Sequence, residues 1–193
     1  MNAIPNLFER QRYVVVPALL TEPLLRFLWR YACDRADGGT IDPGDAYVPG
    51  APCGYGDSVM EHMLERLRPQ IEDATGASLY PTYSYYRIYG SGHRLSRHYD
   101  RPACEISVSV TLGVEGSEVW PLYVEGPNGC DAPRLQPGDG LVYRGIECAH
   151  WRLPFTGVRQ AQMFLHYVTQ SGPHREWRFD KRPGLALTPP LPI

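Results

Sequence analysis

Two potential metal ligands lie two residues apart in the segment RLSRHYDRPACEISVSVTL, which covers residues 94–112. In an extended backbone, side chains at positions i and i+2 point to the same face, so the imidazole of His98 and the carboxylate of Asp100 can converge on one ion. A third ligand then has to come from a distant strand. His150 follows the strand-like segment 140–145 after a glycine-bearing turn. Two histidines and one carboxylate leave three coordination positions open, an arrangement that suits non-haem Fe(II) oxygen chemistry.

The order of these residues resembles the iron(II)- and 2-oxoglutarate-dependent dioxygenases, in particular their prolyl-hydroxylase-like branch. The motif His98-x-Asp100 is followed by His150 and, nine residues later, by Arg159. The segments YGSGHRLSRHYD and LQPGDGLVYRGIECAHWRLPFTGVR are similar to the two motif blocks of that branch. The resemblance covers about residues 78–168. It implies a mainly β protein with N-terminal helices, whose core is a double-stranded β-helix, a jelly-roll or cupin-like fold.

The resemblance also implies a role for each residue of the motif. His98, Asp100 and His150 would hold Fe(II), with 2-oxoglutarate and O2 as cosubstrates at the remaining positions. Arg159 matches the cation that binds the far carboxylate of 2-oxoglutarate, a contact that a bidentate arginine makes well. Tyr89 matches a family tyrosine that helps to hold the same carboxylate. The implied reaction hydroxylates an unactivated C–H bond of a small molecule or amino-acid-like substrate and releases succinate and CO2.

Two other arginines compete with Arg159 for the carboxylate of 2-oxoglutarate. Arg152 lies two residues after the third predicted ligand, and Arg87 lies in a strand-like segment where an inward arginine is costly to bury. Gln160 and Gln162 lie on the face opposite Arg159, so a register change of one residue would turn them inward instead. The weaker candidates for contact with a substrate are Arg87, Tyr85, Arg152 and Trp151.

Other readings of the same residues stay open. A cupin-like metalloenzyme would need no 2-oxoglutarate, and a non-catalytic jelly-roll module would use the metal only for stability. A zinc site built from Cys104, Cys148 and histidines lacks the paired cysteine spacing that such sites usually show. The carboxylate of Asp100 argues against a related halogenase, in which a small residue replaces it.

Bulk composition limits the partners of the chain. It has 193 residues, a formal net charge of −2 and 43% apolar residues, so we expect a soluble globular protein that binds no nucleic acid. No apolar run approaches the roughly 20 residues of a membrane helix, and the N-terminal residues do not resemble a signal peptide. The five cysteines form no CxxC pair. We therefore expect a cytoplasmic protein with reduced thiols and a small-molecule substrate.

The predicted elements form one domain over residues 1–193. Residues 1–77 are expected to give helical support, 78–170 the jelly-roll core, and 171–193 an extended C-terminal segment. Helices are predicted over 21–36 and 58–76, with Pro69 kinking or splitting the second. A long Gly/Pro-rich loop separates them. Apart from a short strand near residue 13, strands are predicted over 79–89, 104–113, 118–126, 140–145 and 159–168.

Overall fold

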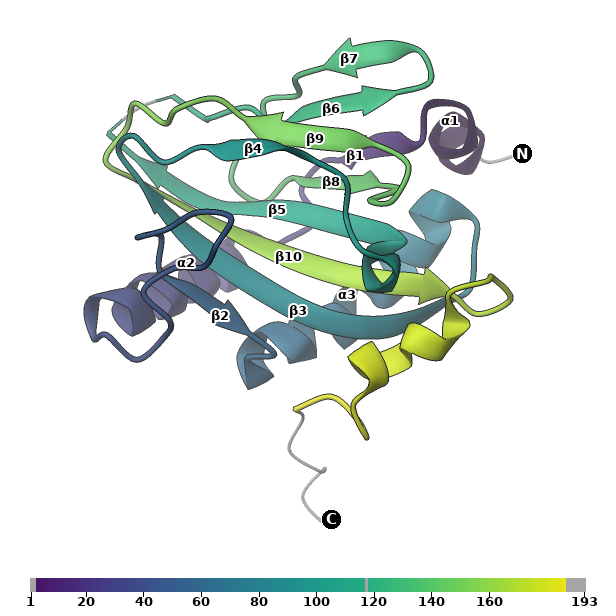
Figure 1. Ribbon diagram of the computed structural model, residues 1–193, viewed down its shortest axis with the longest axis horizontal. Coiled ribbons are helices and arrows are strands. Elements are labelled where there is room, and N and C mark those ends of the chain that lie inside the picture. Colours follow the sequence, from purple (N-terminus) through teal and green to yellow (C-terminus); the bar gives the residue numbers. More distant parts are fainter. Residues whose placement is uncertain (1–2, 117, 187–193) are drawn as a thin grey trace.

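The computed structural model describes residues 3–116 and 118–186. Within them, two antiparallel sheets face each other (Figure 1). The first has the order β1 (Tyr13–Val16), β8 (Gly140–Tyr143), β5 (Ile106–Glu115), β10 (Arg159–Thr169), β3 (Leu79–Gly90) and β2 (Cys53–Tyr55). The second has the order β4 (Leu95–His98), β9 (Ala149–Arg152), β6 (Tyr123–Gly126) and β7 (Gly129–Asp131). Two facing antiparallel sheets confirm the predicted jelly roll.

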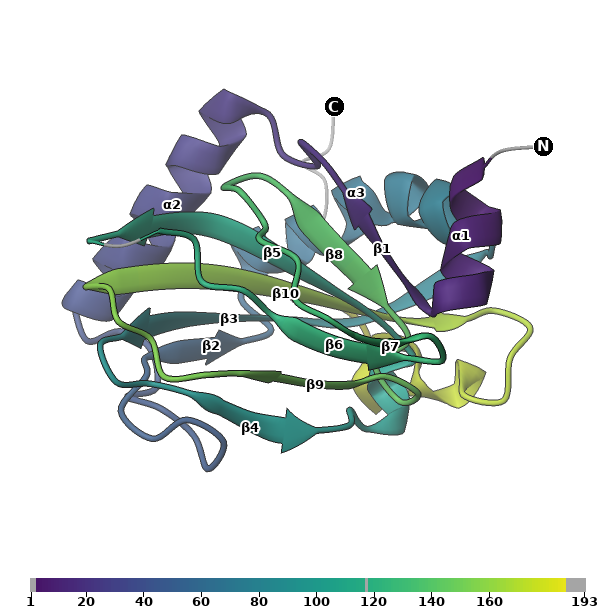
Figure 2. The same cartoon turned by 90° about the horizontal axis from the view of Figure 1, so that it is seen from above.

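Helices cover the outer face of the six-stranded sheet, opposite the four-stranded one (Figure 2). They are α1 (Ala3–Gln11), α2 (Glu22–Asp37) and α3 (Ser58–Thr75). The helix α3 continues through Pro69, so the predicted split is wrong. Leu67 and Ile71 are buried on either side of the proline and pack into the same core, which holds both halves of the helix against the sheet. No helix in the described part of the chain combines the length and the apolar character needed to cross a membrane.

The two faces of β10 have different chemistry because side chains alternate along a strand. Odd-numbered positions pack into the apolar core under the helices, and the hydroxyl of Tyr167 donates to the carbonyl of Leu64 on α3 at 2.7 Å. Even-numbered positions point between the two sheets, where they are largely polar. The residues of this inner face are Gln160, Gln162, Phe164 and His166.

The neighbours of β10 alternate in the same way. On β5, Val108 and Val110 belong to the apolar core, whereas Ser107 and Ser109 bond to inward residues of β10. On β3, Tyr86 and Ile88 belong to that core, and the other face carries Tyr83, Tyr85, Arg87 and Tyr89. The space between the sheets is therefore lined by polar and aromatic side chains.

Two predicted segments differ from the structure. Of the strand predicted over 118–126, only Tyr123–Gly126 forms, because Trp120 leaves the sheet to cover the interior. The C-terminal segment is not extended: a 3-10 stretch, η2 (Arg175–Lys181), folds back against β3. Residues 187–193 of the predicted extension lie outside the described residues. The short strands β2, β4, β7 and β9 have too few residues to give a sequence pattern of their own.

Candidate metal centre

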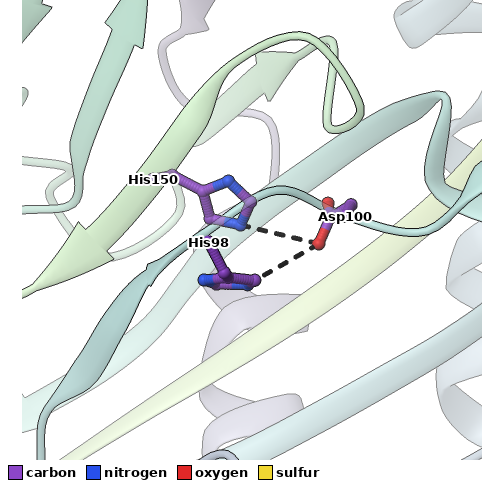
Figure 3. Close-up of side chains that lie close together, drawn as sticks. All are labelled: His98, Asp100 and His150. Carbon is purple, nitrogen blue, oxygen red and sulfur yellow. Dashed lines mark ion pairs between the residues drawn. The ribbon is translucent and has the colours of Figure 1, made fainter.

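The three predicted ligands lie together at one end of the space between the sheets (Figure 3). His98 ends β4 and His150 lies on β9, and the two residues are paired in register across these strands. Asp100 follows β4, and its Oδ1 lies 3.8 Å from Nε2 of His98 and 3.6 Å from Nε2 of His150. One atom from each side chain therefore points to a common position, as a metal ion requires.

Backbone carbonyls fix the tautomers of both histidines. Nδ1 of His98 lies 2.9 Å from the carbonyl oxygen of Ser96, and Nδ1 of His150 lies 3.1 Å from that of Cys148. A carbonyl can only accept, so Nδ1 carries the proton in each ring and Nε2 keeps the lone pair that a metal binds. Burial lowers the pKa of His150, which favours the neutral form that serves as a ligand.

Asp100 is held from behind by a chain of polar groups. The hydroxyl of Ser107 donates to Oδ2 of Asp100 at 2.8 Å, which leaves Oδ1 to face the two histidines. Nδ1 of His166 lies 3.0 Å from the same hydroxyl. The backbone N–H of Asp100 donates to the carbonyl of Gly145. A Cβ atom at Gly145 would clash with Oδ2 of Asp100 and with the backbone carbonyl of Cys104, so the carboxylate needs a glycine there.

The ring of His166 forms part of the wall beside the metal centre. Its centroid lies 4.5 Å from that of Tyr83, whose hydroxyl contacts the thiol of Cys104 at 3.1 Å. Burial lowers the pKa of His166 to about 4, so the ring is neutral at neutral pH. Because the Ser107 hydroxyl gives its proton to a carboxylate, it accepts one from Nδ1 of His166. The other nitrogen, Nε2, is then a hydrogen-bond acceptor.

A cavity of about 300 Å³ opens beside the three ligands. Its wall is predominantly aromatic, with Phe164 and two leucines as the other large apolar contributors. The tyrosines of the wall are Tyr47, Tyr55, Tyr83, Tyr85, Tyr89, Tyr99 and Tyr143. A concave, largely apolar space with a few convergent polar groups is typical of a small-molecule site.

Deeper between the sheets, Arg152 is buried without a counter-ion among the described residues. Nη1 donates to the carbonyl of Trp120, while Nε and Nη2 have no partner in the described structure. Three further buried groups also have no hydrogen-bond partner in the described structure: the hydroxyl of Tyr89, Nε1 of Trp120 and Nε2 of Gln160. These residues contact one another: the ring of Trp120 lies against Tyr89 and Arg152. The backbone N–H of Trp120 donates to Oε1 of Gln160. The cluster is rich in donors and poor in acceptors.

Burial lowers the pKa of Arg152 to about 10, which records how costly this charge is without a partner. Arg152 and His150 are two residues apart on β9 and both point inward. Their backbones are therefore separated by roughly 7 Å. The donor cluster and the metal ligands occupy neighbouring parts of one interior.

Arg159 lies on the other face of the six-stranded sheet. Its guanidinium forms two hydrogen bonds, of 2.9 and 3.0 Å, with the carboxylate of Asp37 at the end of α2. It does not line the cavity. The family spacing had placed Arg159 at the 2-oxoglutarate site, but the strand register instead brings Gln160 and Gln162 between the sheets. This is the alternative considered from the sequence, in which a register change of one residue turns the two glutamines inward.

The weaker candidates separate into two groups. Tyr85 and Arg87 line the cavity, and both bond to Asp45 of the loop between α2 and β2. Trp151 lies on the outer face of β9, where it stacks on Tyr123 with ring centroids 5.4 Å apart. Its side chain therefore faces away from His150, the predicted ligand on the same strand.

Several residues of the site were not assigned to it from the sequence. Ser107 and His166 are not among the predicted site residues, although their positions on the inward faces of two strands could have linked them to Asp100. Asp45 carries no signal, since it lies in an irregular loop. Burial raises the pKa of the Cys104 thiol, so this potential ligand stays protonated. Cys148 belongs to no group of converging ligands among the described residues.

No protein-family model matches the sequence, and no curated protein is a significant match. Solved structures are similar in fold. A prolyl-4-hydroxylase from Pseudomonas putida has a TM-score of 0.68 at 19% identity, covering 86% of this chain and 97% of that one. EctD from S. alaskensis has a TM-score of 0.72 at 19% identity, covering 98% of this chain and 88% of that one.

A third similar structure is HygX from Streptomyces hygroscopicus, determined with nickel, 2-oxoglutarate and hygromycin B bound. Its TM-score is 0.69 at 12% identity, with 89% of this chain and 88% of that chain covered. At these identities the similarity establishes the fold. The chain thus has the double-stranded β-helix fold found in iron(II)- and 2-oxoglutarate-dependent oxygenases, and three potential ligands converge between its sheets.

Proposed function

We propose that this protein is an iron(II)- and 2-oxoglutarate-dependent oxygenase that hydroxylates an unactivated C–H bond of a small molecule. The observation that carries the proposal is the pairing of two sites within one interior. His98, Asp100 and His150 converge as a set of two imidazoles and one carboxylate, and a cluster of unpartnered donors lies beside them. The first suits Fe(II) and the second suits an anion.

The residues present fit Fe(II). Nε2 of both histidines and Oδ1 of Asp100 would hold it, leaving positions for a bidentate cosubstrate and O2. When bound, the iron and 2-oxoglutarate supply oxygen activation, in which O2 gives one oxygen atom to succinate and one to the substrate while CO2 is released. The protein contributes the orientation of the ligands and an interior that excludes bulk water.

We assign the far carboxylate of 2-oxoglutarate to Arg152, with the hydroxyl of Tyr89 as a second donor. Nε and Nη2 of Arg152 are the kind of fork that binds a carboxylate bidentately. The separation of Arg152 from His150 along β9 suits a five-carbon dicarboxylate with its other end on the metal. An anion here would also neutralise a buried cation that has no counter-ion among the described residues. Arg159 is already paired with Asp37 on the other face.

The test is the binding of 2-oxoglutarate to the anaerobic Fe(II) protein, followed by the visible charge-transfer absorption of the complex. Arg152→Gln removes the cation while keeping a polar chain of similar length. We expect its Kd for 2-oxoglutarate to rise about ten- to hundred-fold, because hydrogen bonds to charged groups contribute about 1.5–3 kcal/mol. Arg159→Gln is the matched control and should change the Kd less than about two-fold.

Succinate formation on admission of air then tests turnover, with His150→Ala as the inactive reference. A higher Kd in Arg159→Gln but not in Arg152→Gln would return the anchor to the family position. Iron binding with no response to 2-oxoglutarate in any variant would instead favour a cupin-like metalloenzyme. A bound metal with no oxygen consumption would favour a metal-stabilised binding module.

A further inference from the structure

The charged side chains of the outer cavity wall are already matched by partners within the protein. Arg87 forms an ion pair with Asp45. The same carboxylate accepts from the hydroxyl of Tyr85 and from the backbone N–H groups of Tyr47 and Val48. With four donors, Asp45 has no free lone pair to offer a cationic substrate. The carboxylate compensates the charge of Arg87, whose Nε has no hydrogen-bond partner in the described structure.

The second charge pair of the outer wall joins Arg101 and Asp180. Arg101 donates two hydrogen bonds of 2.7 Å to the two oxygens of Asp180, and Tyr55 donates to the same carboxylate at 2.6 Å. Asp180 lies between Phe179 and Lys181, and all three have positive φ angles of 55–60°. Non-glycine residues adopt this conformation at a cost, so the surrounding contacts hold the segment in place. The ion pair of Arg101 and Asp180 is therefore a fixed part of the cavity wall.

The inner charges also cancel under the proposed function, on which this inference rests. Fe(II), Asp100, doubly ionised 2-oxoglutarate and Arg152 have formal charges that balance to zero. No unmatched charge then remains on the metal side or on the outer wall among the described residues. A charged substrate would have to leave water without gaining a counter-ion, which is unfavourable in a largely apolar cavity.

Aromatic faces dominate the surface that remains for a substrate. Tyr47, Tyr55 and Tyr99 line the cavity although 66%, 45% and 54% of their surfaces are exposed, so they form its rim. The ring of Tyr47 lies over His98, with centroids 5.6 Å apart. Phe164 forms part of the wall between the sheets. Flat aromatic surfaces bind rings through contact area without requiring charge.

One polar atom of the wall is free to select a substrate group. Nδ1 of His166 is used by Ser107, and no hydrogen bond to Nε2 occurs in the described structure. The ring lines the cavity beside the metal ligands. A neutral imidazole with its proton on Nδ1 presents Nε2 as an acceptor, so its complement is an O–H or uncharged N–H donor.

We infer that the substrate is an uncharged, ring-bearing molecule whose hydroxyl or amine N–H donates to Nε2 of His166 while its ring lies between the tyrosines of the rim. The charge pairs exclude carboxylates and cations. The aromatic wall binds the ring, and His166 orients it toward the metal.

The test uses four probes that share one ring: benzyl alcohol, benzyl methyl ether, benzoate and benzylammonium. Their affinities are measured by ligand-observed NMR on the protein loaded with Zn²⁺ and 2-oxoglutarate, where no turnover occurs. We expect benzyl alcohol to bind best. The ether, which lacks the O–H donor, should bind about five-fold more weakly, as the loss of one hydrogen bond predicts. Both charged probes should bind more weakly still.

His166→Phe keeps an aromatic ring beside Tyr83 and removes the acceptor. We expect it to abolish the preference for the alcohol over the ether, a readout that compares two ligands on one protein. Tyr47→Ala should weaken all four probes together and preserve that preference. Equal binding of alcohol and ether by the wild type would overturn the role of His166. Tighter binding of benzoate or benzylammonium, or no binding by any probe, would overturn the substrate class.

Calorimetric titration of Zn²⁺ and then 2-oxoglutarate is done first, so failure of the proposed function is seen separately. If neither binds, the probes are compared on metal-free Arg152→Gln protein, which lacks the inner cation. The pairs Asp45–Arg87 and Arg101–Asp180 do not involve the metal. Asp100 has no counter-ion in this metal-free variant, so benzylammonium is left out of the comparison. A preference for the alcohol over the ether would then support the substrate class without the oxygenase, and tighter binding of benzoate would overturn it.

Discussion

At the scale of single residues, the metal centre depends on groups that orient the ligands without binding the ion themselves. The carbonyls of Ser96 and Cys148 set the histidine tautomers, and the hydroxyl of Ser107 leaves one oxygen of Asp100 facing the histidines. Such supporting contacts commonly change metal affinity by about ten- to hundred-fold. Ser107 and His166 therefore matter to the site although neither is a predicted ligand.

Substituting Ser107 tests this support directly. Ser107→Ala should weaken Fe(II) or Zn²⁺ binding about ten-fold, since Oδ2 of Asp100 loses its donor and the carboxylate can rotate. Ser107→Thr keeps the hydroxyl and should restore most of the affinity. The measurement is a competitive metal titration at constant pH. Equal affinities in the wild type and Ser107→Ala would show that Gly145 and the backbone alone hold the carboxylate.

His166 should make the stability of the metal-free protein depend on pH. Burial lowers the pKa of His166 from its ordinary value of 6.5 to about 4, so between these pH values the unfolded chain binds more protons than the folded one. The contribution of His166 to the free energy of unfolding is therefore fully present above pH 6.5 and is lost as the pH falls toward 4. The change is at most about 3 kcal/mol. Urea unfolding of the wild type and His166→Gln over this range measures it; parallel pH profiles would contradict the assignment.

At the scale of elements, the loop between α2 and β2 is attached to β3 through one carboxylate. Asp45 is about one-third exposed and bonds to Arg87 and Tyr85, and it brings Tyr47 over His98. The same loop forms part of the cavity rim. The position of the rim relative to the metal centre therefore depends on this attachment.

Asp45→Asn should loosen the loop, because the neutral amide cannot compensate the buried charge of Arg87. We expect the free energy of unfolding to fall by about 2 kcal/mol, less than for a fully buried pair because Asp45 is partly exposed. Amide hydrogen exchange should increase over residues 38–52. The affinity for 2-oxoglutarate should stay within about two-fold, since Arg152 lies elsewhere. Unchanged exchange in the loop would mean that other contacts hold it.

At the scale of the whole molecule, the metal ligands connect parts of the chain that are distant in sequence. His98 and Asp100 flank the end of β4, while His150 lies about fifty residues later on the neighbouring strand. An ion held by both segments binds the folded state and not the unfolded chain. Metal binding and global stability should therefore be linked.

Zn²⁺ or Fe(II) at one hundred times its Kd should stabilise the folded protein by about 2.7 kcal/mol. For a chain of this size, that raises the Tm by roughly 5–10 °C. Differential scanning fluorimetry with and without metal measures the change, and chelation should reverse it. His150→Ala should remove the response. If the Tm of the wild type did not change when metal is added, that result would argue against an ion bound at these three residues.

Short-range sequence patterns were enough to predict the metal ligands and most of the helices and longer strands. The spacing of His98 and Asp100 and the later His150 indicated a common ion, because alternation along a strand directs i and i+2 to one face. The same alternation puts Tyr85 and Arg87, two of the weaker predicted substrate contacts, on one face of β3. The helices and longer strands followed from hydrophobic periodicity and turn residues.

Only the tertiary structure decided which arginine enters the interior. Arg152 and Arg159 are equally basic and follow His150 by two and nine residues. A strand has two faces, and a shift of one residue exchanges the inward face for the outward one. Packing of the odd-numbered side chains of β10 under the helices turns Arg159 toward Asp37, while Arg152 on β9 points inward. Local sequence sets the alternation of a strand, and long-range packing sets which of its faces is inside.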